Sequence, residues 1–161
     1  MDYQERAERI ETYGGAYVEL TEALKQFPPE MWKWQAPGGW SIHEIICHLA
    51  DAEANAYARF RRLVAEPGST VLAWDEDRWT AGLGYHEQSF SDALELFRWL
   101  RITTHKLLKA LPEGVWEQTV EHSETGTLTL DNLLAAVVNH VYSHIEQMGG
   151  IYQEWQAQER G

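Results

Sequence analysis

The sequence predicts an all-α protein, a four-helix bundle with a crossover connection. Apolar residues recur at three- and four-residue steps in four long segments, which is typical of amphipathic helices. The other stretches show no alternation of apolar and polar residues over more than a few positions, so no strand is expected. Helices of roughly 22 to 28 residues can share one core only by lying side by side. A chain of 161 residues has the length of one such unit, and we expect a single domain over residues 1–161.

Proline and capping residues mark the first two helices. The first helix is expected over about residues 4–27, and the proline pair that follows ends it. The second helix begins after Ser41, because Ser41 and Glu44 have the spacing of a capping box. It runs until Pro67, where the chain can no longer continue as a helix.

A long connection over residues 70–88 joins the second helix to the third. It is rich in aromatic and acidic residues and has no steady period, so we expect a loop that packs over one end of the helices. A connection of this length allows a crossover in place of a tight hairpin. The third helix then starts near Ser89 and ends at Pro112, and the fourth runs from Thr129 towards Trp155.

Charge and cysteine content narrow the range of functions. With a net charge of −12 the chain repels phosphate backbones and anionic lipid surfaces, so we expect neither nucleic acid nor membrane partners. No segment approaches the roughly 20 apolar residues of a membrane span, and the N-terminus lacks the apolar run of a signal peptide. We therefore expect a cytoplasmic protein. Its single cysteine, Cys47, excludes an intramolecular disulfide.

Three histidines are predicted to face the core. His140 and His144 lie four residues apart on the fourth helix and can present their rings to one ion. Both fall on the apolar stripe between Leu133 and Ile151, and His48 falls on the apolar stripe of the second helix. A buried polar group without a partner costs about 1 to 3 kcal/mol, so each imidazole needs one.

Two interpretations of these histidines remain open. Each ring can be satisfied separately, by a hydroxyl, a backbone carbonyl or water, or one divalent ion can satisfy all three. Three histidine ligands leave a coordination position free for water or substrate, which is the pattern of catalytic zinc sites. Nickel and iron(II) also accept imidazole, so the ligand type does not select the metal.

The remaining histidines and the cysteine are assigned other roles. His43, His86 and His105 are expected to face solvent, whereas His122 could reach the mouth of the bundle. Cys47 is interpreted as a small buried hydrophobe.

Several polar side chains are candidates for supporting the histidines. Asp51 is either a solvated helix residue or a functional group, and as a functional group Asp51 or Asn55 would orient a ligand or act as an acid or base near a bound water. Ser143 and Gln147 could also orient a ligand. The three acids between the two tryptophans of segment Trp74–Trp79 are interpreted as solvated loop charges.

A family resemblance connects these features. The run from Trp40 to Asp51 with His48 inside it, the run Trp74–Trp79, and the pair His140 and His144 together resemble the DinB-like superfamily, in its YfiT-type branch of metal-dependent hydrolases. The likeness spans nearly the whole chain. It implies a four-helix bundle with crossed topology, and a divalent metal, zinc or nickel, at one end. It also implies metal-ligand roles for His48, His140 and His144, a homodimer, and relatives that act with a low-molecular-weight thiol as cosubstrate.

The leading hypothesis is an enzyme for a small-molecule substrate. His48, His140 and His144 would hold a divalent ion that activates a thiol or a water, and the resemblance favours the thiol. No catalytic side chain is assigned. The alternative is a non-catalytic module that binds a small ligand or a partner, in which a structural metal is closed off by a fourth ligand such as Cys47 or Asp51.

Overall fold

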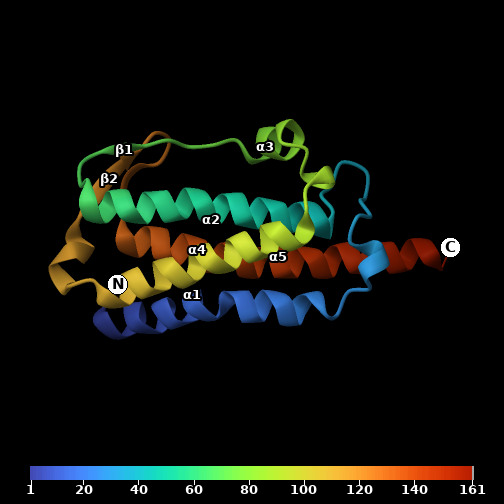
Figure 1. The fold of residues 1–161 in the computed structure, drawn as a ribbon, viewed down its shortest axis with the longest axis horizontal. Helices are drawn as coiled ribbons and strands as arrows, with labels where there is room; N and C mark the ends of the chain where they lie inside the picture. The colour runs from blue at the N-terminus through green and yellow to red at the C-terminus, as the bar shows by residue number, and fades with distance from the viewer. Residues whose placement is uncertain (161) are drawn as a thin grey trace.

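Four long helices lie side by side in the computed structural model, which describes residues 1–160 (Figure 1). They are α1 (Tyr3–Leu24), α2 (Ile42–Ala65), α4 (Phe90–Ala110) and α5 (Leu130–Glu159). The predicted four-helix bundle is confirmed. Within residues 1–160 no helix combines the length and the apolar character that crossing a membrane requires. The expected domain over residues 1–161 includes Gly161, which lies outside the described residues, and its extent stays a prediction.

The order of the helices around the bundle is crossed. Helix α4 packs against α1 and α2, and α5 also packs against α1 and α2, so α1 and α2 face each other diagonally. Helices α1 and α5 run in one direction, whereas α2 and α4 run in the opposite one (Figure 1). Because α2 and α4 are parallel neighbours, the chain between them must return along the length of α2. The predicted crossover is therefore present.

Side-chain caps fix the starts of the helices at the predicted positions. Glu44 and Ser41 exchange both hydrogen bonds of the capping box, since Ser41 Oγ accepts from Glu44 N at 3.1 Å and Glu44 Oε2 accepts from Ser41 N at 2.8 Å. Ser89 caps α4 and Thr129 caps α5 through the same kind of bond to a backbone N–H. A cap of this type stabilises a helix by about 1 kcal/mol.

The connection between α2 and α4 is more ordered than the sequence indicated. It contains the short strand β1 (Thr70–Val71), the helix α3 (Glu76–Gly82) and the 3-10 turn η2 (Tyr85–Glu87). It runs along the outer side of α2 (Figure 1). The expectation of a loop packed over one end of the helices was wrong, because the chain between the parallel helices α2 and α4 has to return along α2. Part of it is helical because Asp75 caps α3 by accepting from Arg78 N at 2.9 Å.

A small sheet also departs from the all-helical expectation. Strand β1 pairs in parallel with β2 (Thr119–His122), and β2 pairs with β3 (Gly126–Thr129) in a hairpin whose register places Val120 opposite Leu128. The expectation of no strands was wrong because each strand is too short to show a period. The remaining 3-10 turns are η1 (Pro29–Met31) and η3 (Glu113–Glu117).

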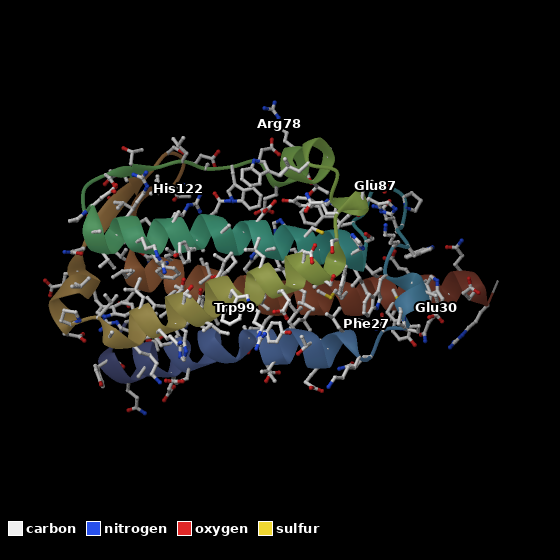
Figure 2. All side chains as sticks on the ribbon, viewed as in Figure 1. Phe27, Glu30, Arg78, Glu87, Trp99 and His122 are labelled. Carbon is white, nitrogen blue, oxygen red and sulfur yellow. The ribbon has the colours of Figure 1, made fainter. Side chains whose placement is uncertain are left out.

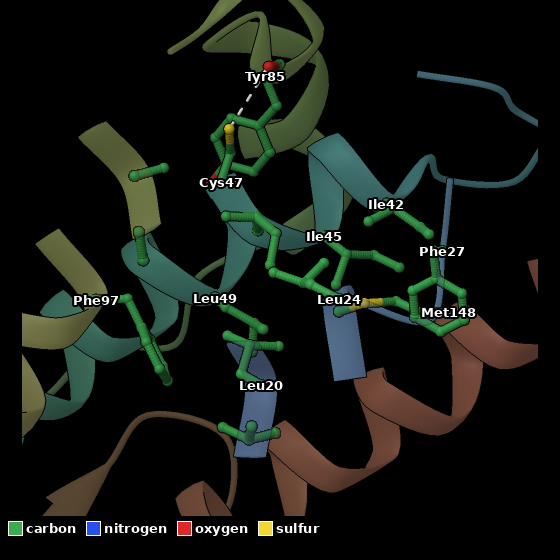
Figure 3. Packing of buried hydrophobic residues seen from close by; sticks show 14 of the residues in the cluster. Leu20, Leu24, Phe27, Ile42, Ile45, Cys47, Leu49, Tyr85, Phe97 and Met148 are labelled. Atoms are coloured by element: carbon green, nitrogen blue, oxygen red, sulfur yellow. Dashed lines mark hydrogen bonds between the residues drawn. The ribbon is translucent and has the colours of Figure 1, made fainter. Parts of the chain in front are cut away.

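The core consists of two apolar clusters with a charged pair between them. Figure 3 shows the first cluster, in which Leu20 and Leu24 of α1 pack near Ile45 and Leu49 of α2. The second cluster fills the other end of the bundle and includes Ile10, Phe60, Leu63, Leu108 and Leu134. Between the two, Arg101 Nε donates to Glu53 Oε2 at 2.7 Å, and both side chains are 2% exposed. This pair joins α4 to α2 inside the bundle.

Candidate metal centre

Three histidines from α2 and α5 meet where these helices face each other. His140 Nε2 lies 3.0 Å from His48 Nε2 and 2.9 Å from His144 Nε2. His48 and His144 are buried and His140 is half-buried. One ring nitrogen of each residue lies within 4.8 Å of the others, and no other residue of 1–160 joins them in a group of this kind. The structure thus brings together the three histidines that the sequence selected.

All three rings are neutral near pH 7. Burial, together with the smaller effect of the neighbouring imidazoles, lowers the pKa of His48 to about 3 and that of His140 to about 4. Burial also lowers the pKa of His144. His144 Nδ1 lies 2.8 Å from Gln147 Oε1, and because a carbonyl oxygen only accepts, Nδ1 carries the proton. His144 therefore presents the lone pair of Nε2 to the cluster.

The donor set fits a bound metal ion. A neutral imidazole nitrogen carries either one proton or one lone pair, so His140 Nε2 cannot make a full hydrogen bond to both of its neighbours. A cation shared by three lone pairs removes this conflict. Ligands bound about 2.1 Å from one ion are about 3 Å apart when the angle between them is near 90°, which agrees with the nitrogen spacing here. Neutral imidazole is also the form that binds zinc, nickel or iron.

Two tryptophans form walls around the cluster. The Trp40 ring stacks on that of His144, with centroids 6.2 Å apart and planes 10° from parallel. The Trp74 ring stacks on that of His48 at 5.5 Å and 18°, and Trp79 packs edge-on against Trp74. Trp40 immediately precedes the cap of α2, and Trp74 comes from the crossover connection. The segment Trp74–Trp79, which had no assigned role, therefore covers His48.

Glu76 is a residue of the site that sequence reasoning missed. Its Oε2 lies 4.0 Å from His48 Nε2, and its side chain is 50% exposed. Partial burial raises the pKa of Glu76, and the neighbouring Asp77 raises it further. The interpretation of the three acids as solvated loop charges holds for the exposure of Glu76 but not for its place, because Glu76 begins α3 and lies beside His48. The local sequence does not distinguish Glu76 from Asp75 and Asp77. Glu76 lies near His48 because of the way α3 is placed on α2.

A cleft opens beside the histidines between α2, α5 and the connection. Its volume is about 220 Å³. The residues that line it are Ala52, Ala56, Arg59, Trp74, Glu76, Leu133, Ala136, Val137 and His140. Because His140 and Glu76 both border the cleft, a small molecule in it would reach the histidine cluster.

Comparison with known proteins identifies the family. The model of the DinB superfamily matches residues 13–148 of this chain. The chain belongs to the DinB superfamily. This membership confirms the resemblance carried by the tryptophan and histidine motifs, and it agrees with the crossed four-helix bundle.

Relatives within the superfamily are named for metal-dependent hydrolysis. The chain is 29% identical over 109 residues to a protein of Bacillus subtilis (strain 168) named "Putative metal-dependent hydrolase YfiT", and the match covers 67% of this chain and 61% of that protein. It is also 29% identical over 108 residues to the protein of Oceanobacillus iheyensis with the same description and the designation OB0782, covering 67% and 62%. The chain thus matches less than two thirds of the length of these relatives.

Solved structures share the DinB-superfamily fold. YfiT from Bacillus subtilis, described as having an unusual four-helix bundle topology, superimposes with a TM-score of 0.88 at 22% identity, over 97% of this chain and 90% of that one. A mycothiol-dependent maleylpyruvate isomerase superimposes with a TM-score of 0.72 at 13% identity, over 89% of this chain and 60% of that one. At these identities the likeness concerns the fold.

Neither expected fourth ligand points into the cluster of this DinB-superfamily protein. Cys47 is buried, and its Sγ lies 3.6 Å from the carbonyl oxygen of Tyr85. Asp51 Oδ2 accepts a hydrogen bond from Tyr85 Oη at 2.6 Å. Both side chains therefore anchor η2 of the connection on α2. Asn55 does not contact the histidines either, since its side chain donates to the backbone oxygen of Asp51 within α2.

The other histidines of this DinB-superfamily protein lie outside the cluster, and their surroundings correct the expectation of solvent exposure. His43 is buried, with its Nε2 2.9 Å from the carbonyl oxygen of Gln88. His86 and His105 are half-buried. His122 ends β2 and accepts from two backbone N–H groups of the hairpin turn, away from the bundle mouth. Figure 2 labels His122 and shows it near the β-strands, whereas α3 lies further along α2.

Proposed function

We propose that this protein is a metal-dependent enzyme whose His48, His140 and His144 hold a divalent ion, zinc or nickel, that activates a thiol or a water. The observation that carries the proposal is the convergence of the Nε2 atoms of three neutral histidines, with neighbouring distances of 2.9 and 3.0 Å, between α2 and α5. The names of the relatives support metal-dependent hydrolysis, and the mycothiol-dependent isomerase of the same fold supports thiol chemistry. The substrate would be a small molecule.

The surrounding residues have separate tasks in this proposal. A bound divalent ion would lower the pKa of a thiol or water, so that the nucleophilic anion exists near neutral pH. Gln147 holds the proton on His144 Nδ1 and so keeps its Nε2 available. Trp40 and Trp74 fix the ring planes by stacking and keep bulk water away from two of the histidines. Glu76 presents a carboxylate to which a nucleophile in the cleft can donate a hydrogen bond.

The choice of a catalytic over a structural ion is supported by the ligand count. A structural zinc site is closed by four protein ligands, whereas catalytic sites have three and an open position. Within residues 1–160, the group of metal-binding side chains contains three histidines, and Cys47 and Asp51 are engaged with Tyr85. The cleft along His140 would give the open position access to solvent and substrate.

Elemental analysis of protein purified without chelator tests the ligand set. We expect close to one divalent ion per chain in the parent and its loss in His48→Ala and in His144→Ala. The matched control is His122→Ala, which removes an imidazole of the hairpin and should leave the metal content unchanged. A parent that contains no metal and takes up neither zinc nor nickel, or an alanine variant that keeps the ion, would contradict the proposal.

The nucleophile is tested on the metal-loaded parent. We expect metal-dependent transfer of a low-molecular-weight thiol to an electrophile such as 1-chloro-2,4-dinitrobenzene, above the rate of ester hydrolysis under the same conditions. Glutathione, bacillithiol and mycothiol are compared as thiols. Hydrolysis without any thiol transfer would assign water as the nucleophile and leave the metal-dependent class intact. An ion bound at full occupancy with neither activity would favour the non-catalytic binding module.

A further inference from the structure

Arg59 is a cation of the cleft without an acidic partner. It is half-buried, and its Nη2 donates to the backbone oxygen of Leu72 at 2.6 Å. None of the ion pairs within residues 1–160 includes Arg59. By contrast Arg62, one turn further along α2, pairs with Glu66 at 2.9 Å. Arg59 is therefore held in place by a neutral carbonyl group and keeps its positive charge uncompensated.

An uncompensated cation here needs an explanation, because the chain has 25 acidic residues and only 13 Lys and Arg. Desolvation lowers the pKa of Arg59, so its surroundings disfavour the charge. A guanidinium has five N–H donors, and the bond to Leu72 uses one of them. The remaining donors can bind a carboxylate in two parallel hydrogen bonds.

The position of Arg59 relates it to the histidine cluster. Eleven residues separate His48 from Arg59 on α2, which corresponds to three turns and a rotation of only about 20°, so both lie on one face of the helix. Between them on this face lie Ala52 and Ala56, whose short side chains leave the space of the cleft. An arginine side chain on a helix points back toward the helix N-terminus, and so toward His48.

The connection also contacts both ends of the cleft. The carbonyl group that holds Arg59 belongs to Leu72, and the ring that stacks on His48 belongs to Trp74. Two residues of extended chain span about 7 Å. The Cα atoms of His48 and Arg59 are about 16 Å apart along α2, and the Arg59 side chain points back over part of this distance. Because Arg59 and His140 both border the cleft, a small molecule in it lies between the guanidinium and the histidine cluster.

We propose that this cleft binds a small substrate with a carboxylate group, which pairs with Arg59 while the reacting end of the molecule lies at the histidine cluster. The placement of the reacting end at the histidines rests on the proposed function, whereas the binding of the carboxylate by Arg59 does not depend on it. The cleft of about 220 Å³ is smaller than the roughly 300 to 1,000 Å³ of pockets for drug-sized ligands. The carboxylate of Glu76 at the histidine end opposes a second negative charge there, which favours a monocarboxylate over a dianion.

Hexanoate is a suitable probe, with hexanamide as its uncharged counterpart. Binding is followed by NMR of 15N-labelled protein, with the ion bound and after its removal by chelator. The backbone amide signals of residues that line the cleft give the affinity in every variant, and the side-chain Nε–H signal of Arg59 reports its own contact in the parent and in Arg62→Gln. The variants are Arg59→Gln and the control Arg62→Gln. We expect hexanoate to bind the parent and Arg62→Gln within two-fold of each other and Arg59→Gln at least ten-fold more weakly. Hexanamide should bind parent and Arg59→Gln equally weakly. The amide spectra report whether each variant is folded.

The outcomes separate this inference from the proposed function. Binding of hexanoate that depends on Arg59 in chelator-treated protein supports the carboxylate site whether or not the histidines hold a metal. Absence of binding to the parent, equal affinity for hexanoate and hexanamide, or hexanoate affinity unchanged in Arg59→Gln would each overturn the inference. If hexanoate affinity is unchanged in Arg59→Gln and hexanoate binds only when the ion is present, the carboxylate binds the metal and the proposed function still stands.

Discussion

The buried pair of Glu53 and Arg101 offers a test of how the bundle is held together. Arg101 donates to Glu53 Oε2 at 2.7 Å, to the backbone oxygen of Tyr13 at 3.1 Å and to that of Val137 at 3.0 Å. Glu53 also accepts from the hydroxyl group of Tyr13. Two side chains therefore connect α2 and α4 to each other and to α1 and α5.

Replacing one partner leaves the other charge buried. In Glu53→Leu the guanidinium of Arg101 remains 2% exposed with only carbonyl groups as partners, and the hydroxyl group of Tyr13 loses its acceptor. Removing one partner of a buried pair costs about 3 to 5 kcal/mol. For a domain of this size, such a loss lowers the melting temperature by about 6 to 20 °C. Arg101→Met should have a comparable cost, because it leaves the carboxylate of Glu53 buried.

The double variant distinguishes a buried charge from a simple packing defect. In Glu53→Leu with Arg101→Met no charge is left between the two apolar clusters, so the cost of the double variant should fall at least about 2 kcal/mol below the sum of the single costs. Urea unfolding followed by circular dichroism measures all four proteins after metal removal. The exposed pair Arg62 and Glu66 is the control, where Glu66→Leu should change stability by less than about 1 kcal/mol. Additive single costs, or a single cost below about 1 kcal/mol, would refute the reasoning.

Three further predictions concern the helix contacts and the cluster. A methyl group on Gly14 would come within 2.7 Å of the His105 ring, whereas a methyl group on Gly15 meets nothing within 4 Å. Thermal unfolding should therefore show that Gly14→Ala destabilises the protein by about 1 to 3 kcal/mol and that Gly15→Ala stabilises it by up to about 1 kcal/mol. Glu76→Gln should weaken zinc binding about ten-fold in a competition assay with a chromogenic chelator, because it removes a carboxylate next to the cluster, and exposed Asp77→Asn should not. Gln147→Ala should weaken zinc binding by about 10 to 100-fold, because the Nδ1 proton of His144 loses its acceptor. Unchanged zinc affinity in Glu76→Gln or in Gln147→Ala would contradict the role given to that residue.

The sequence predicts the long helices well because their boundaries are local. The box of Ser41 and Glu44, the cap at Ser89 and the cap at Thr129 each depend on residues three positions apart, and all three lie where expected. The small sheet depends on pairing between Val71 and His122, which are far apart in the sequence. No local period records this pairing, so β1 was missed. Strands β2 and β3 form a local hairpin, but each has only four residues, which is too short to show an alternating period.

The three histidines of the cluster could also be predicted from the local sequence. A helical stripe determines which face a residue occupies, and His48, His140 and His144 occupy the faces that α2 and α5 turn toward each other. The contribution of Glu76 depends on how the connection lies on α2, which helix periodicity does not determine. His43 was assigned to solvent because it lies in the first turn of α2, and it is buried because η2 folds back onto that turn.

The topology itself explains why the connection carries residues of the site. Parallel neighbours α2 and α4 oblige the chain to return along a helix of 24 residues, which is about 36 Å long. An extended chain would need about 11 residues for this distance, and the segment between the two helices is longer than that. The surplus forms α3 and η2, which bring Trp74 and Glu76 over His48 and fasten the connection through Tyr85 to Asp51. Shortening the connection should therefore remove the cover of the cluster before it disturbs the bundle.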